Sequence, residues 1–155
     1  MKDFNISLKK GELGEKIVRE FLEAKDWIVY QPMTKDKAHY FDMMCTFKKE
    51  KVIAIDVKTK ARLNKWNAQG IDKKHYNEYI NFINTTKVNF YLFFVDDKIG
   101  DVHYADIKNL TNPIYPNDKI IAWKIEDMNF IFKLTDEQII ELSKYDQRNY
   151  KFNPT

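Results

Sequence analysis

The spacing of apolar residues predicts a helix at the start of the chain, followed by short strands. Between residues 8 and 25, Leu13, Ile17 and Phe21 recur at helical intervals and form one apolar stripe. After this helix, apolar and β-branched residues gather in short runs that polar or charged segments separate. Runs of this kind are typical of strands. We place the first three strands at residues 27–31, 40–47 and 52–59.

The second half of the chain predicts further helices and strands in mixed order. Residues 60–72 are polar and irregular, and Asp72 stands where it can cap a second helix. Residues 88–96 are almost continuously apolar, which favours a strand buried on both faces. The order of elements predicts an α/β fold in which helices flank a central mixed sheet. The further predicted elements are a helix at 73–84, strands at 101–107, 120–123 and 128–134, and a final helix from Thr135 or Asp136 to about residue 145.

The composition is typical of a folded protein with a single domain. The 155 residues are 44% hydrophobic and 15% aromatic, which is enough for one sizeable core. Cys45 is the single cysteine and cannot form an internal disulfide, which favours a reducing compartment. The N-terminus shows no signal-peptide pattern, and no apolar run approaches the roughly 20 residues of a membrane span. We therefore expect a cytoplasmic protein without a membrane partner.

The strongest chemical signal is a pair of charges in the most apolar of the first three predicted strands. Alternation along residues 52–59 puts Asp56 and Lys58 on the same face. Charges in such a strand are costly to bury unless they are paired or hold an ion. Asp42, 14 residues before Asp56, ends a second short apolar segment. Two carboxylates and a lysine that converge would form a Mg²⁺ site suited to cleavage of a phosphodiester.

The distribution of charge agrees with an anionic substrate. Residues 1–75 carry 17 Lys and Arg against 11 Asp and Glu, whereas residues 76–155 carry 9 against 12. The basic half contains the candidate site, as a phosphodiester substrate would require. A lysine-rich surface without a functional role explains the asymmetry equally well. Other enzyme classes find little support, because the chain has neither a GxxxxGK[ST] phosphate loop nor a GxSxG elbow.

Three short motifs resemble those of the PD-(D/E)XK nuclease superfamily in their order and spacing. They are Gly11–Glu15 in the first predicted helix, Phe41-Asp42 in the second strand and Asp56-Val57-Lys58 in the third. Within that superfamily they are similar to archaeal Holliday junction resolvases and related small bacterial and phage nucleases. Two positions depart from the usual pattern, because Phe41 stands in place of proline and Asp56 in place of glutamate.

The resemblance covers only part of the chain. It spans residues 8–95, which would form the core of a single nuclease domain at 1–155. Residues 100–155 would then be a C-terminal extension, whose function the resemblance does not reach.

The resemblance implies a restriction-endonuclease-like core with a metal-dependent active site. The implied catalytic residues are Glu15, Asp42, Asp56 and Lys58. Asp42, Asp56, the Val57 carbonyl and Glu15 would hold Mg²⁺, for which Mn²⁺ can substitute. Glu12, three residues before Glu15, lies near the same helix face and is the alternative helix acid.

Each catalytic candidate also has a purely structural interpretation. Asp56 and Lys58 can form an ion pair at an exposed sheet edge, Asp42 can be a turn residue, and Glu15 can be solvated helix surface. Their joint occurrence favours the active site.

Residues after the third predicted strand are candidates for substrate binding. Lys60 and Arg62 can hold the scissile or a flanking phosphate, or form a solvated basic strand end. Trp66 lies in a polar loop, where it can stack on a base or anchor the loop on the core.

Three polar residues lie where nucleases of the superfamily often place an additional polar group near the metal. They are Gln69, His75 and Tyr79. Among them we favour His75, although a surface histidine at the start of a helix is the stronger interpretation of that residue.

These observations lead to a Mg²⁺-dependent nuclease, with DNA favoured over RNA as the substrate. The preferred hypothesis is a structure-specific endonuclease of the Holliday junction resolvase type, with a role in DNA recombination or repair. Two symmetric cuts would require two active sites, which favours a homodimer. The alternatives are a restriction-like, repair or phage nuclease of other substrate geometry, and a non-catalytic nucleic-acid-binding module of the same fold.

Overall fold

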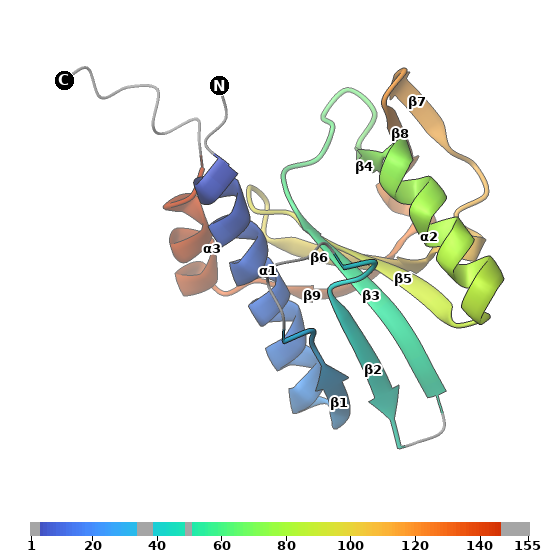
Figure 1. The fold of residues 1–155 in the computed structure, drawn as a ribbon. Helices are drawn as coiled ribbons and strands as arrows, with labels where there is room; N and C mark the ends of the chain where they lie inside the picture. The colour runs from blue at the N-terminus through green and yellow to red at the C-terminus, as the bar shows by residue number, and fades with distance from the viewer. Residues whose placement is uncertain (1–3, 34–38, 49–50, 147–155) are drawn as a thin grey trace.

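The computed structural model describes residues 4–33, 39–48 and 51–146 (Figure 1). Its elements are α1 (Phe4–Ala24), β1 (Trp27–Tyr30), β2 (Met43–Phe47), β3 (Lys51–Thr59), β4 (Ala68–Asp72), α2 (Lys73–Thr86), β5 (Asn89–Val95), β6 (Asp101–Asp106), η1 (Ile107–Asn109), β7 (Ile114–Asn117), β8 (Ile120–Lys124), η2 (Ile125–Asp127), β9 (Asn129–Lys133) and α3 (Asp136–Ser143). Within these residues, no helix is both long and apolar enough to cross a membrane.

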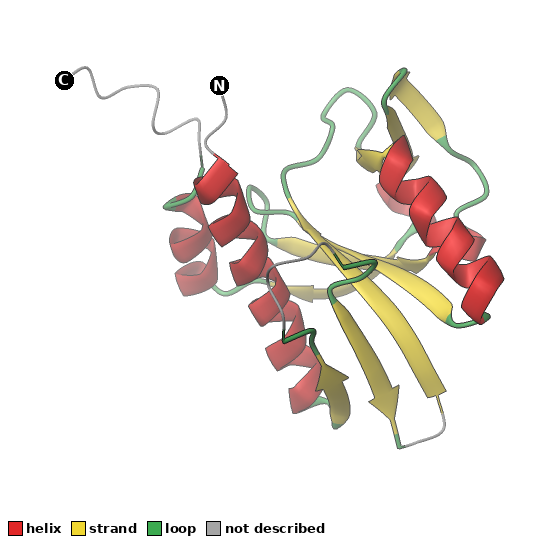
Figure 2. Ribbon diagram, in the orientation of Figure 1, coloured by secondary structure: helices red, strands yellow, loops and turns green. Residues whose placement is uncertain are grey.

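A mixed six-stranded sheet forms the centre of the fold, in the order β1-β2-β3-β5-β6-β9. The pair β3 and β5 is parallel, and the other neighbouring pairs are antiparallel. Helices α1 and α3 lie side by side on one face of this sheet, and α2 lies on the other (Figures 1 and 2). The predicted α/β fold with a central mixed sheet between helices is therefore confirmed.

Strand β3 lies inside the sheet, bonded to β2 on one side and β5 on the other. Its side chains alternate between two hydrophobic clusters. Ile53, Ile55 and Val57 face α1, whereas Ala54 faces α2. The interpretation of Asp56 and Lys58 as an ion pair at an exposed sheet edge is therefore wrong, because the strand that carries them has two neighbours.

A second, three-stranded antiparallel sheet has the order β4-β8-β7. The sequence predicted residues 60–72 to be irregular, but the last five of them form β4. Gly70 allows this strand to lie close to β8, since a Cβ at Gly70 would be 2.9 Å from the Cβ of Ala122. Strand β7 is an edge strand, the position in a sheet that tolerates Pro116.

The C-terminal third of the described chain completes the central sheet. Strands β6 and β9 extend it beyond β5, and the final helix packs beside α1. Of the two predicted caps for this helix, Thr135 is the one used. Its hydroxyl accepts a hydrogen bond from the backbone of Gln138, whose side chain in turn accepts one from the backbone of Thr135.

Helix α1 approaches the end of β3 very closely at Gly14. A Cβ at this position would lie 1.7 Å from Oγ1 of Thr59, so only glycine fits without a shift of the helix or the strand. The contact brings the next residue, Glu15, to the end of β3 that also carries Asp56 and Lys58.

Candidate functional site

Asp42 is held over β3 by two hydrogen bonds. Its backbone N–H donates to the carbonyl of Ile55 at 3.0 Å, and its Oδ2 accepts from the backbone N–H of Val57 at 2.6 Å. Asp42 immediately precedes β2, so the pairing of β2 with β3 sets its position. Asp42 and Asp56, which are 14 residues apart in sequence, therefore lie at the same site, one just before β2 and the other on β3.

Asp56 is buried, with 5% of its surface exposed, and it has two donors. Nζ of Lys58 and the hydroxyl of Tyr79 each lie 2.8 Å from its Oδ2. A buried carboxylate needs partners of this kind, because desolvation of an unpaired charge is unfavourable. Both contacts fall on the same oxygen, so Asp56 is tied to Lys58 on β3 and to Tyr79 on α2.

Glu15 reaches the site from α1. Its side chain is partly buried and shares a hydrogen bond with the side chain of Asp42. Glu12, the alternative helix acid, has an exposed side chain. The geometry thus supports Glu15 as the acid that the first helix contributes.

Asp42 and Glu15 bind their protons more tightly than ordinary carboxyl groups do. Burial, together with the charges of Asp56 and Glu15, raises the pKa of Asp42 to about 9. Burial also raises the pKa of Glu15, and its hydrogen bond with Asp42 opposes this in part. Without a bound cation, the site therefore retains a proton at neutral pH that three ordinary carboxylates would release.

Lys58 remains a cation in this environment. Burial lowers the pKa of its ammonium group, but the carboxylates of Asp56 and Asp42 outweigh burial and raise the pKa above its usual value. The Nζ atom also lies 6.0 Å from the centre of the Tyr79 ring, within range of a cation–π contact. Lys58 is thus suited to supply positive charge and unsuited to accept a proton near neutral pH.

The donor set fits a hydrated hard cation. Among the described residues, no three His, Cys, Asp or Glu side chains are grouped closely enough to hold a metal by themselves. Mg²⁺ does not require such a group, because it is bound by one or two carboxylates and keeps several waters. The crowded carboxylates that raise the pKa of Asp42 would be relieved by a divalent cation. The residues present therefore fit Mg²⁺.

Tyr79 is the site residue that the sequence analysis undervalued. It is 4% exposed, donates to Asp56 and stacks on Phe90 with ring centres 4.4 Å apart. His75, which was favoured, lies one turn earlier, with its ring 6.3 Å from that of Tyr79 and Nδ1 4.0 Å from Oδ2 of Asp72. His75 and Tyr79 lie on the same face of α2, so their spacing in sequence could not show which of them contacts the acidic residues of the site.

We expect Tyr79→Phe to destabilise the protein by about 1–3 kcal/mol, because it removes a buried hydrogen bond to a charged group. Phenylalanine retains the stacking on Phe90. Urea unfolding measures the change. Tyr76→Phe is the matched control, since Tyr76 lies on the same helix and packs on Trp123 at 5.8 Å. Equal effects of the two substitutions would contradict the role of the Tyr79 hydroxyl.

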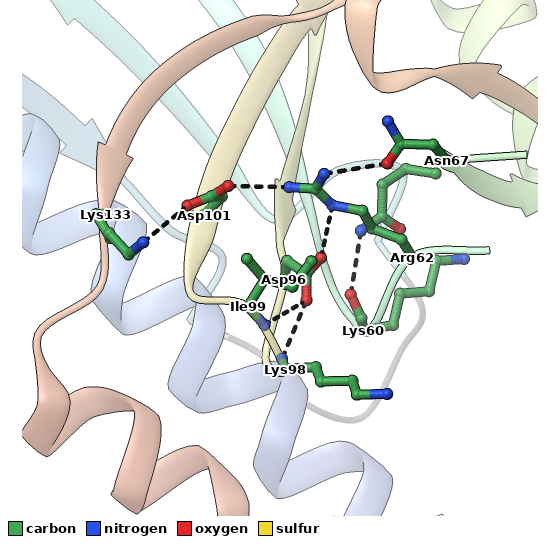
Figure 3. A network of polar contacts seen from close by, with 9 residues as sticks. Lys60, Arg62, Asn67, Asp96, Lys98, Ile99, Asp101 and Lys133 are labelled. Atoms are coloured by element: carbon green, nitrogen blue, oxygen red, sulfur yellow. Dashed lines mark hydrogen bonds and ion pairs between the residues drawn. The ribbon is translucent and has the colours of Figure 1, made fainter. Parts of the chain in front are cut away.

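Three of the expected substrate-binding residues contact the protein itself. Nζ of Lys60 donates to the carbonyl of Gly70, and Nε2 of Gln69 donates to the carbonyl of Lys60 at 3.2 Å. The guanidinium of Arg62 contacts Asp96, Asp101 and Asn67 (Figure 3). These contacts give Lys60, Gln69 and Arg62 a structural role in joining the end of β3 to β4 and β5.

Comparisons with known proteins support the fold. No protein-family model matches the chain, and no curated protein matches it in sequence. Among solved structures, it is similar to the Holliday junction resolvase Hjc of the archaeal hyperthermophile Archaeoglobus fulgidus, with a TM-score of 0.57 and 11% identity over 76% of this chain and 90% of that one. A bacterial homing endonuclease superposes with a TM-score of 0.48 and 11% identity, over 97% of this chain and 99% of that one. The predicted resemblance to nucleases of the Holliday junction resolvase type is thus confirmed for the fold.

Proposed function

We propose that this protein is a metal-dependent nuclease that hydrolyses phosphodiester bonds in DNA. The observation that carries the proposal is the ion pair of buried Asp56 with partly buried Lys58 in the middle of the sheet, next to Asp42 and Glu15. A stable fold has no need of three neighbouring acids, two of which, Asp42 and Glu15, have a pKa that burial raises. The similarity of fold to a Holliday junction resolvase supports the same class of activity.

In the proposed reaction, the acidic residues would bind the metal and Lys58 would act on the attacking water and the phosphate. Asp42 and Asp56 would hold Mg²⁺, with the Val57 carbonyl and Glu15 as further ligands, directly or through water. When bound, Mg²⁺ would supply an activated water and positive charge for the phosphate. Lys58 would orient the attacking water and stabilise the negative charge that develops on the phosphate oxygens. The hydrogen bonds from Val57 and Tyr79 would keep the two aspartates in place.

We further propose that the substrate is a branched DNA and that the enzyme acts as a homodimer, with a role in DNA recombination or repair. The fold of a known resolvase supports this choice. A symmetric dimer would place two identical sites on a symmetric junction.

The test is cleavage of a panel of labelled substrates: a four-way junction, a flap, a linear duplex, a single strand and RNA. We expect cleavage with Mg²⁺ or Mn²⁺, none with EDTA, and a fall of at least about 10²-fold for Asp56→Asn. The preferred substrate would identify the type of nuclease. If no substrate is cut while wild type and Asp56→Asn bind DNA equally well, the chain is instead a non-catalytic binding module.

A further inference from the structure

The residues that follow β3 form a tight turn that several hydrogen bonds and an ion pair hold in place. Leu63 and Ala68 pair across it, with hydrogen bonds of 2.8 and 3.4 Å between their backbone groups. Within the turn, the N–H of Trp66 donates to the carbonyl of Leu63, and that of Asn67 to the carbonyl of Asn64. We call residues 64–67 the tryptophan turn.

Arg62 fastens this turn to the central sheet (Figure 3). Its Nε lies 2.9 Å from Oδ2 of Asp96, and its two terminal nitrogens contact Asp101 at 3.0 Å and Oδ1 of Asn67 at 3.1 Å. The Arg62 side chain is 13% exposed and that of Asp96 only 2%, so solvent screens their ion pair weakly.

The anchoring contacts extend to both sides of the turn. Oδ1 of Asp96 accepts from the backbone N–H groups of Lys98 and Ile99, each at 3.0 Å, which fixes the carboxylate that Arg62 uses. On the other side, the N–H of Ile125 donates to the carbonyl of Asn67 at 2.9 Å. The turn is therefore held by its own polar contacts.

The side chain of Trp66 is not part of these polar contacts. Among the described residues, the two hydrophobic clusters include Trp27 and Trp123 but not Trp66. Its side chain is only partly buried, and the ammonium of the exposed Lys65 lies 4.9 Å from the centre of its ring. The contacts that hold the turn do not involve the side chains of Trp66 and Lys65. These two side chains are therefore suited to bind an external partner.

The length of chain between them limits how far Trp66 can lie from the proposed cleavage site. Trp66 is eight residues beyond Lys58, so their Cα atoms are separated by at most about 29 Å. This distance corresponds to about eight stacked nucleotides along one strand. A strand bound at the active site can therefore reach the turn.

We propose that the tryptophan turn is a preformed stacking platform for an unpaired base on the strand bound at the cleavage site, with Lys65 binding the adjacent phosphate. Bases in an intact duplex are stacked on each other and do not expose a face to Trp66, whereas single strands and branch points do. The platform would select substrates with unstacked bases over linear duplexes. This inference rests on the nucleic-acid substrate of the proposed function but not on cleavage.

Binding in EDTA tests the platform apart from catalysis. Fluorescence anisotropy would measure the affinity for a labelled single strand, a flap and a linear duplex of equal length. Trp66→Ala should weaken binding to the single strand and the flap about 5- to 150-fold, with a smaller loss for Trp66→Phe. The control is Tyr115→Ala, because Tyr115 is 60% exposed and has Lys73 Nζ at 4.9 Å from its ring, a similar pair at a different place.

Three outcomes would overturn the platform. In the first, Trp66→Ala binds the single strand and the flap as tightly as the wild type. In the second, Trp66→Ala loses as much affinity for the linear duplex as for the single strand. In the third, Tyr115→Ala loses as much affinity for the single strand as Trp66→Ala does. Weaker binding by Trp66→Ala together with an absence of metal-dependent cleavage in the wild type would support the platform and refute the proposed nuclease activity.

A second measurement leaves Trp66 in place. In a Trp27→Phe background the remaining tryptophans are Trp66 and the fully buried Trp123. Binding of a single strand should therefore quench mainly the fluorescence of Trp66. Asn67→Gly removes the Oδ1 atom that accepts from a terminal nitrogen of Arg62, and glycine readily adopts the positive φ of 47° found there. We expect Asn67→Gly to increase the quenching of Trp66 by acrylamide and to weaken single-strand binding severalfold. Absence of quenching by the single strand, or no change for Asn67→Gly, would overturn the preformed platform.

Discussion

Replacement of Lys58 by methionine is expected to reduce cleavage about 10²–10³-fold while leaving metal binding intact. The neighbouring carboxylates raise the pKa of the Lys58 ammonium against the effect of burial, so the group carries its charge throughout the neutral range. That charge is available to the phosphate in the transition state. Methionine keeps a similar stem but removes the charge. Single-turnover cleavage of the preferred substrate with saturating Mg²⁺ gives the rate.

Metal binding by Lys58→Met separates this role from a ligand role. A cation beside the aspartates repels a divalent ion, so its removal should leave the affinity for Mn²⁺ unchanged or increased. Titration calorimetry with Mn²⁺ measures this directly. Lys74→Met is the control for loss of one positive charge, because Lys74 is exposed in the first turn of α2. A rate for Lys58→Met within tenfold of the wild type would contradict the assignment.

The sequence alone correctly predicted those features of the fold that depend on the local pattern of residues. The alternation of β3 correctly placed Asp56 and Lys58 on one face, and the structure pairs them at 2.8 Å. The almost continuous apolar run of β5 correctly predicted burial on both faces, since Phe90 and Phe93 belong to different clusters. In both strands, the residues themselves carry the signal.

The sequence was insufficient where the partner lies far along the chain. Strand β4 is short and has no continuous apolar run, and it becomes a strand through its pairing with β8, about fifty residues later. The same holds for Arg62, whose partners Asp96 and Asp101 follow 34 and 39 residues later. A basic residue after an active-site strand is typical of a phosphate ligand, and only the tertiary structure reveals that its guanidinium is bound within the protein.

Asp42→Asn is expected to abolish metal-dependent cleavage and yet to stabilise the metal-free protein. Asparagine has nearly the same shape, and its Oδ1 can still accept from the N–H of Val57. It cannot take a negative charge, so it cannot replace the carboxylate that would bind the cation. We expect cleavage to fall by at least about 10³-fold and Mn²⁺ binding to be lost in calorimetry.

The gain in stability follows from the pKa of Asp42. The folded state raises this pKa from 3.8 to about 9, so between these values the folded state binds more protons than the unfolded state. The free energy of unfolding of the metal-free wild type should therefore fall as the pH rises from 4 to 9. Each unit of pKa difference corresponds to about 1.4 kcal/mol, shared here with Glu15, and asparagine removes the contribution of Asp42.

Urea unfolding in EDTA at pH 5 and pH 8 measures this difference. Asp42→Asn should exceed the wild type by about 1–4 kcal/mol at pH 8 and by less at pH 5. Saturating Mg²⁺ should reverse the order, because a ligand stabilises only the protein that binds it. A wild type whose stability does not depend on pH, or an Asp42→Asn variant that is less stable at pH 8 in EDTA, would show that the crowded carboxylates impose no strain. If the wild type loses stability as the pH rises and Asp42→Asn is the more stable protein at pH 8 in EDTA, Asp42 is a residue that lowers the stability of the metal-free protein and is kept for binding a cation.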